Sequence, residues 1–262
     1  MYLKGFGHGV SIGVEPSGSS ACLWTETDSV PDSRDTGYGT RIARFKFADG
    51  AVLQPDSSQA ARFDPVPGPD RNTAAVDPVD NRLVVRHRVD GAWKYHLYDL
   101  ATFKTGTFTP PAAIVQPAVL TGVTFQGYTS PGQYLHTLDG TAYTYDADGN
   151  RTSTSTTYLT SVDRNTGTVH ERRLSKAGES LFHREPEGLA VQIPDTADPA
   201  AVRLHIGLGS MESLTDTGKK AGFSSKDLLV RPPRGRARPV SRAGPAGALP
   251  PRRAGVPRRR HA

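Results

Sequence analysis

Residues 181–191 read LFHREPEGLAV, in which a charged stretch with a proline runs directly into a glycine and an apolar segment. This junction recurs in the chain, because EGLAVQI at 187–193 aligns with HGVSIGV at 8–14. Glycine falls on glycine in the alignment, and the apolar positions agree. A polar residue in front of a glycine at the start of a strand is therefore a repeated feature, and internal repeats are an early indication of a fold.

The repeat has four copies at nearly regular intervals. QGYTS at 126–130 fits the same frame, and DRNTAAV at 70–76 fits it more loosely. The copies start at residues 8, 70, 126 and 187, which gives spacings of 62, 56 and 61 residues. A period of about 40–60 residues that holds about four strands is typical of β-propeller blades.

Short alternating runs, rather than helical periodicity, fill the first 230 residues. Each run is bounded by Gly, Pro, Asp or Asn, which is typical of β-strands and their turns. The 27 glycines and 21 prolines also favour many turns over long helices. We predict an all-β fold, a β-propeller with about four blades over residues 1–230, followed by a disordered tail at 231–262.

The tail at 231–262 contains ten arginines, seven prolines and no aromatic residue. Such a segment buries too little apolar surface to offset the entropy that it would lose on ordering. The rest of the chain has 22 basic and 26 acidic residues, so it is mildly acidic. The tail is either a basic arm with non-specific attraction for nucleic acid and anionic surfaces, or a frameshift or read-through extension of a GC-rich gene. The abrupt change of composition at Val230 favours the second interpretation.

Polar residues at the start of each repeat define a candidate ligand-binding site. In a propeller the inner strands surround a central channel, so these residues are expected at one mouth of it. Glycine suits this position because neighbouring backbones approach closely. The ring would either hold a hydroxylated or cationic ligand or a metal, or bind channel water and cap backbone amides. Its members are His8, Asp70, Gln126 and Glu187, with Arg184 close to Glu187 in sequence.

Tyr38 is a candidate for stacking on a sugar ring, because flanking glycines keep it from being buried in the predicted loop. No catalytic residue is assigned, and we expect no metal and no cofactor. The eight histidines lack zinc-type spacing, and no G-x-S-x-G elbow is present. No stretch is apolar enough to span a membrane. Cys22 is the single cysteine, which excludes an intrachain disulfide.

Several segments resemble the β-propeller domain shared by teichoic acid biosynthesis protein C-like proteins and staphylococcal phage receptor-binding proteins. The resemblance covers roughly residues 1–230 and is carried by MYLKGFGHGVSIGVEPSGSSACLWTETDS (1–29), GYGTRIARFKFADG (37–50), DPVDNRLVVRH (77–87), TFQGYTSPGQYLHTLDGTAY (124–143), TSVDRNTGTV (160–169) and FHREPEGLAV (182–191).

This resemblance implies an extracellular or cell-wall protein whose propeller binds a cell-wall glycan such as teichoic acid, and we expect a monomer. An alternative is a propeller hydrolase or lyase acting on a glycan or phosphodiester, with Glu187 and either His8 or Glu185 as acid and base. A third interpretation is a truncated product without independent function, because family members carry a leader and an earlier blade. In that case MYLKGF at 1–6 would pair with the edge of the last blade or stay unpaired.

Overall fold

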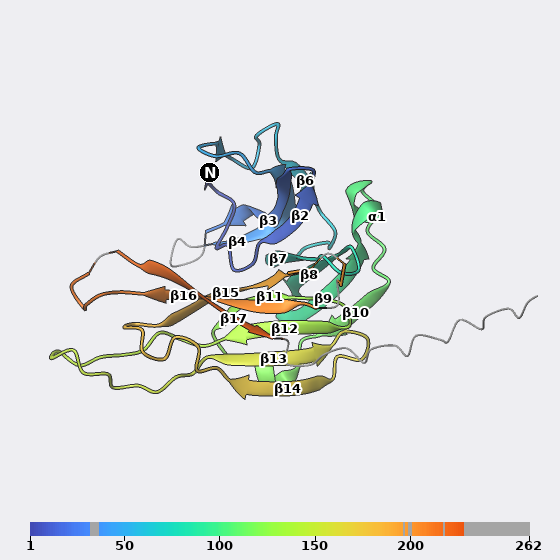
Figure 1. The fold of residues 1–262 in the computed structure, drawn as a ribbon. Coiled ribbons are helices and arrows are strands. Elements are labelled where there is room, and N and C mark those ends of the chain that lie inside the picture. The colour runs from blue at the N-terminus through green and yellow to red at the C-terminus, as the bar shows by residue number, and fades with distance from the viewer. Residues whose placement is uncertain (32–36, 196, 199–200, 217, 228–262) are drawn as a thin grey trace, which may run out of the picture. The chain divides into compact units, whose positions relative to one another are not determined.

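Four antiparallel sheets make up almost all of the regular structure, and they are arranged as the blades of a β-propeller (Figure 1). This confirms the predicted fold class. The computed structural model describes residues 1–31, 37–195, 197–198, 201–216 and 218–227. The predicted tail at 231–262 lies outside the described residues.

Each blade is a meander in which neighbouring strands pair antiparallel, with four strands in the first three blades and three described strands in the fourth. The first two blades consist of β2 (Gly13–Ser17), β3 (Ser20–Val30), β4 (Tyr38–Lys46) and β6 (Ala61–Phe63), and of β7 (Arg71–Asp77), β8 (Arg82–Val89), β9 (Ala92–Asp99) and β10 (Ala112–Val115). The last two consist of β11 (Phe125–Thr129), β12 (Tyr134–Asp139), β13 (Tyr158–Asp163) and β14 (Val169–Leu174), and of β15 (Glu185–Gln192), β16 (Arg203–Ser210) and β17 (Lys220–Asp227).

The inner strands of the blades lie side by side. β7 contacts both β2 and β11, and β11 in turn contacts β15. Three of these strands begin where the repeat predicts, at Arg71, Phe125 and Glu185. We call the end of the blades at which these inner strands begin the mouth.

The first inner strand begins at Gly13 rather than at His8, so this part of the prediction is wrong. The reason is Glu26 on β3, whose carboxylate accepts a hydrogen bond from the backbone N–H of Gly9 at 2.6 Å. A Cβ atom at Gly7 would lie only 2.5 Å from the carboxyl carbon of Glu26. The glycines of this segment therefore let the chain wrap around a buried carboxyl instead of pairing as a strand.

The N-terminal residues do not pair with the last blade. Tyr2 and Leu3 form β1 (Tyr2–Leu3), which pairs in parallel with β5 (Val52–Leu53) in the connection between β4 and β6. Phe6 is buried with Phe45 and Leu53, and its ring meets that of Phe45 edge-to-face. The N-terminal residues thus pack against β4 of the first blade and against β5, because their apolar side chains contact apolar residues there.

Apolar clusters fill the spaces between successive blades. The cluster between the first two blades contains Trp24, Ile42, Leu83, Tyr98 and Phe103, among others. The cluster between the second and third contains Ala75, Val84, Tyr95, Tyr128 and Leu135, among others. The cluster between the third and fourth is built from aliphatic side chains, chiefly Leu138, Leu159, Ile206 and Leu208.

The repeated junction is a β-bulge in the third and fourth blades. The pairing of β11 with β12 shifts register between Phe125 and Gly127, and that of β15 with β16 shifts between Pro186 and Gly188. Gly127 and Gly188 have φ angles of +149° and +148°, which disfavour residues with a side chain. The residue before each glycine is thereby left out of the ladder, and a bulge redirects such a side chain.

Gly127 also marks the closest backbone approach at the mouth. A Cβ atom there would lie 3.2 Å from the Cα of Gly188, the backbone N of Leu189 and the backbone O of Val10. These atoms belong to the fourth blade and to the segment before β2, and backbone atoms do not yield easily. Gly188 has nearly the same φ angle, but a Cβ atom added to it would meet no atom within 4 Å.

These two glycines give a matched test of the close approach. Both Gly127→Ala and Gly188→Ala introduce backbone strain of about 1–3 kcal/mol, but only Gly127→Ala forces neighbouring backbones apart. We expect Gly127→Ala to lower the free energy of unfolding further, by about 1–3 kcal/mol. Urea unfolding of both variants measures this difference, and equal losses would mean that the blades tolerate the added methyl group.

Candidate functional site

His8 and Tyr38 lie together at the mouth. Their rings are stacked with centroids 5.3 Å apart, and the guanidinium carbon of Arg71 lies 4.1 Å from the centre of the Tyr38 ring. Tyr38 is the first residue of β4 and is half-buried, so it is not in an open loop as its flanking glycines suggested. An arginine already occupies part of the aromatic surface that was predicted to stack on sugar.

Asp70 is held by Arg88, whose Nε lies 3.0 Å from both carboxylate oxygens. Hydrogen bonding from Arg88 lowers the pKa of Asp70. The pair lies next to Arg71, because Arg71 and Arg88 are register partners on β7 and β8. The sequence-predicted residue Asp70 is thus part of an ion pair at the mouth.

Gln126 and Glu187 are the two residues left out of the ladder by the bulges. Their neighbours Gly127 and Gly188 are close in space. The Nε2 of Gln126 donates to the backbone O of Gly140 at 3.0 Å, and the Glu187 side chain is 45% exposed. Among the described residues, no hydrogen bond or ion pair joins His8, Gln126 and Glu187 to one another.

Glu187 belongs instead to a group of charged residues at the start of β15. The ammonium of Lys219 contacts both Glu185 and Glu187, and the Nε2 of His183 lies 3.3 Å from Glu185. Burial opposes ionisation of Glu185, but hydrogen bonding from Lys219 lowers its pKa. Burial and the neighbouring Glu185 raise the pKa of Glu187. The pKa values of the two carboxyls are thereby shifted in opposite directions.

Arg184 is not exposed at the mouth, contrary to the expectation that it faces a ligand. Its side chain is fully buried, because its guanidinium bonds the hydroxyls of Ser155 and Thr157 and the backbone oxygens of Ser175 and Ala177. Arg184 and His183 have positive φ angles of 32° and 70°. Arg184 therefore anchors the chain to the loops of the third blade just before Glu185 and Glu187, which we call the acidic pair.

Arg86 is a mouth residue that the sequence did not reveal. Only 4% of it is exposed, and its guanidinium carbon lies 3.5 Å from the ring centre of Trp93 and 3.7 Å from that of Phe125. Nε and Nη2 both donate to the side-chain oxygen of Gln116, at 3.1 and 2.8 Å. Burial lowers the pKa of Arg86, but an arginine stays charged at neutral pH. Its cation is thus fixed in place by neutral groups.

Three arginines lie at the mouth near Tyr38. Arg71 lies over the Tyr38 ring, Arg88 is its register partner on β8, and Arg86 lies two residues before Arg88 on the same strand. We call Tyr38, Arg71, Arg86 and Arg88 the arginine–tyrosine cluster. Asp70 is the carboxylate that is paired with it in the described chain, so the cluster carries excess positive charge. The strand run NRLVVRHRV contained this signal only as alternating arginines.

The described residues contain no group of three or more His, Cys, Asp or Glu side chains arranged to hold a metal ion. None of the helices in the described part is long and apolar enough to cross a membrane.

No protein-family model matches the sequence. A stretch of 86 residues, 33% of this chain, is 31% identical to "Putative major teichoic acid biosynthesis protein C" of Bacillus subtilis (strain 168). That stretch covers 19% of the relative, so the chain spans only a small part of the relative's length. The similarity agrees with the resemblance noted in the sequence, and it extends over too little of either protein to define a family.

Glu26 supports the arginine–tyrosine cluster from behind. It is buried, and its carboxyl accepts from the backbone N–H of Gly9 at 2.6 Å and from that of Gly39 at 2.5 Å. These glycines flank His8 and Tyr38, so Glu26 positions both stacked rings. Burial raises the pKa of Glu26 from 4.5 to about 7, although the backbone N–H donors act in the opposite direction.

The Glu26 carboxyl makes the free energy of unfolding depend on pH. Because its pKa is higher in the folded state, its contribution is complete below about pH 4.5 and is lost as pH rises through about 7. We expect wild type to lose about 3 kcal/mol over this window relative to Glu26→Gln, which cannot ionise. Urea unfolding at several pH values measures both proteins. Parallel profiles would show that the N–H donors offset the effect of burial and leave the pKa of Glu26 the same in the folded and unfolded states.

Proposed function

We propose that this propeller is a binding module that recognises an anionic cell-wall glycopolymer of the teichoic acid type at the arginine–tyrosine cluster, in an extracellular or cell-wall setting. The observation that carries the proposal is that Arg71, Arg86 and Arg88 lie on adjacent strands at the mouth, where Asp70 is the carboxylate paired with them in the described chain. Guanidinium groups match the geometry of phosphate oxygens and bind them in a bidentate manner.

The rigidity of Arg86 supports this proposal. A buried cation stacked between Trp93 and Phe125 loses little conformational freedom when a ligand binds. Arg71 and Arg88 are partly exposed; Arg88 lies two residues further along the same strand as Arg86, and Arg71 lies on the neighbouring strand β7. A repeating polymer with phosphate and hydroxyl groups would place phosphate on the arginines and hydroxyls near Gln126 and Glu187.

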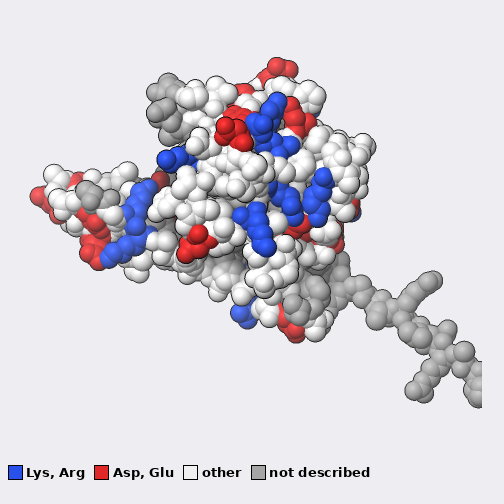
Figure 2. All heavy atoms as spheres, turned by 90° about the horizontal axis from the view of Figure 1, so that it is seen from above, with Lys and Arg blue, Asp and Glu red and all other residues white. Residues whose placement is uncertain are grey.

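The similarity to the Bacillus subtilis protein is a second support for the proposal. The relative's printed name refers to teichoic acid biosynthesis, and the similarity covers 86 residues of this chain. Local contacts matter more than the overall field, because basic and acidic side chains are interspersed over the face shown in Figure 2. The expected partner is therefore selected by the mouth and not by net charge.

A hydrolase or lyase is the second candidate, and the acidic pair favours it. Two touching carboxyls whose pKa values are pushed apart are a common arrangement for acid and base roles. Purified walls incubated with the protein, followed by mass spectrometry of the supernatant, separate the two candidates. Binding alone releases no fragments, whereas fragments released by wild type and not by Glu187→Gln would support catalysis.

The binding proposal predicts weaker binding when either partly exposed arginine of the cluster is replaced. Arg71→Met and Arg88→Met should each weaken binding to teichoic acid-bearing walls roughly tenfold, the effect of about 1.4 kcal/mol, and reduce its sensitivity to salt. Arg82→Met is the matched control, because Arg82 lies at the other end of β8. Pull-down on walls with and without teichoic acid measures binding. Arg71→Met and Arg88→Met proteins that bind as well as wild type would contradict the proposal.

A further inference from the structure

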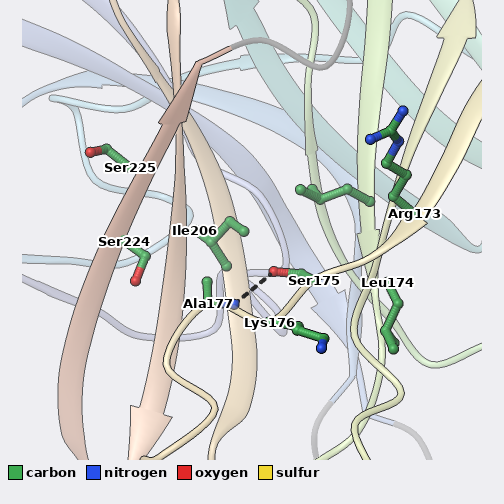
Figure 3. Close-up of a pocket in the computed structure, with 9 residues that line it drawn as sticks. Arg173, Leu174, Ser175, Lys176, Ala177, Ile206, Ser224 and Ser225 are labelled. Atoms are coloured by element: carbon green, nitrogen blue, oxygen red, sulfur yellow. Dashed lines mark hydrogen bonds between the residues drawn. The ribbon is translucent and has the colours of Figure 1, made fainter.

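A cavity of about 370 Å³ lies between the third and fourth blades, away from the arginine–tyrosine cluster. Figure 3 shows Ile206, Ala177 and Ser175 in its middle, with two serines of β17 on one side and the end of β14 on the other. Its lining comes from the end of β14 and the loop after it, and from β13, β16 and β17: Leu159, Arg173, Leu174, Ser175, Lys176, Ala177, Ile206, Ser224 and Ser225.

The cavity exists because this interface is less completely filled than the other two. Tryptophan, tyrosine and phenylalanine side chains occupy the spaces between the first three blades. The third interface has aliphatic side chains in its core, and β17 contributes Ser224 and Ser225 to the cavity lining. Ser224 is the register partner of Ile206, so a small side chain stands where a larger one would close the space.

The lining has an apolar floor and a polar, basic rim. Leu159 and Ile206 are buried and form the floor with Ala177. Ser175, Lys176, Ser224 and Ser225 make up the polar part of the lining, and no lining residue is acidic. Arg173 is engaged by Glu171, so Lys176 is the lining cation without an ion-pair partner in the described chain.

We propose that this cavity binds a small organic anion, with a phosphate or carboxylate head at Lys176 and a short aliphatic body on Leu159 and Ile206. An apolar floor with a few polar groups that fix orientation is the usual composition of a small-molecule site, and the volume is at the lower end of the range of about 300–1,000 Å³. Aliphatic side chains without an aromatic platform suit an alkyl body better than a sugar ring. The ligand would join the third blade to the fourth.

Hexyl phosphate is the probe that tests this proposal, with hexanol and inorganic phosphate as its two halves. We expect hexyl phosphate to bind the full chain in calorimetry and to raise Tm, because a ligand of the folded state stabilises it. Hexanoate distinguishes a carboxylate head from a phosphate head. Each half of the probe alone should bind at least tenfold more weakly than the whole.

Two variants locate the binding. Lys176→Met should weaken binding of hexyl phosphate about tenfold, while Lys94→Met, an exposed lysine on β9, should leave it unchanged. Ser224→Leu should fill the cavity and abolish binding without lowering Tm. Binding that survives Ser224→Leu and Lys176→Met, or no binding by wild type, would overturn the proposal.

The cavity and the mouth can be tested independently of each other. Arg71→Met and Arg88→Met change the mouth and should leave hexyl phosphate binding intact. Conversely, Ser224→Leu should retain binding to cell walls. Loss of both activities in one of these variants would show that the cavity and the mouth are not independent sites.

Discussion

The close approach of backbones at the mouth is the constraint on which the rest of the structure depends. The chain just before β2 and the first residues of β11 and β15 meet there, and Gly127 has backbone atoms of two other segments within 3.2 Å of a possible Cβ. The bulges at Gly127 and Gly188 allow this approach and at the same time release Gln126 and Glu187 from the ladder. The same local geometry thus brings the blades together and supplies polar side chains to the mouth.

Buried arginines connect one blade to the next. Arg86 of the second blade stacks on Phe125 of the third, and Arg164, after β13, donates to Asp77 of the second at 2.6 Å. Arg184 ties the start of the fourth blade to loops of the third. Breaking a buried ion pair such as Arg164–Asp77 costs about 3–5 kcal/mol, because one charge stays buried without its partner. Apolar contacts are non-directional. These directional hydrogen bonds and ion pairs therefore fix the positions of the blades relative to one another.

The sequence predicted the fold better than it predicted the site. The alternating runs and the glycine repeat are local signals, and they placed three inner strands correctly. The fold of residues 7–10 around Glu26 depends on a carboxyl 17 residues from Gly9, and the pairing of β1 with β5 spans about 50 residues. No local pattern contains such contacts. Arg86 and Arg184 were missed or misplaced for a related reason, since an arginine in an alternating run is normally exposed.

The placement of charge explains why recognition would be confined to the mouth. Outside the tail the chain is mildly acidic, and exposed charges more than about 8 Å apart are largely screened at physiological ionic strength. An anionic polymer would therefore gain little from the protein as a whole. Aromatic rings hold the guanidinium groups of the arginine–tyrosine cluster, and Glu26 positions Tyr38 and the adjacent His8 before any ligand arrives, so short-range contacts replace long-range attraction. Binding of this kind depends on the spacing of phosphates along the polymer and not only on their number.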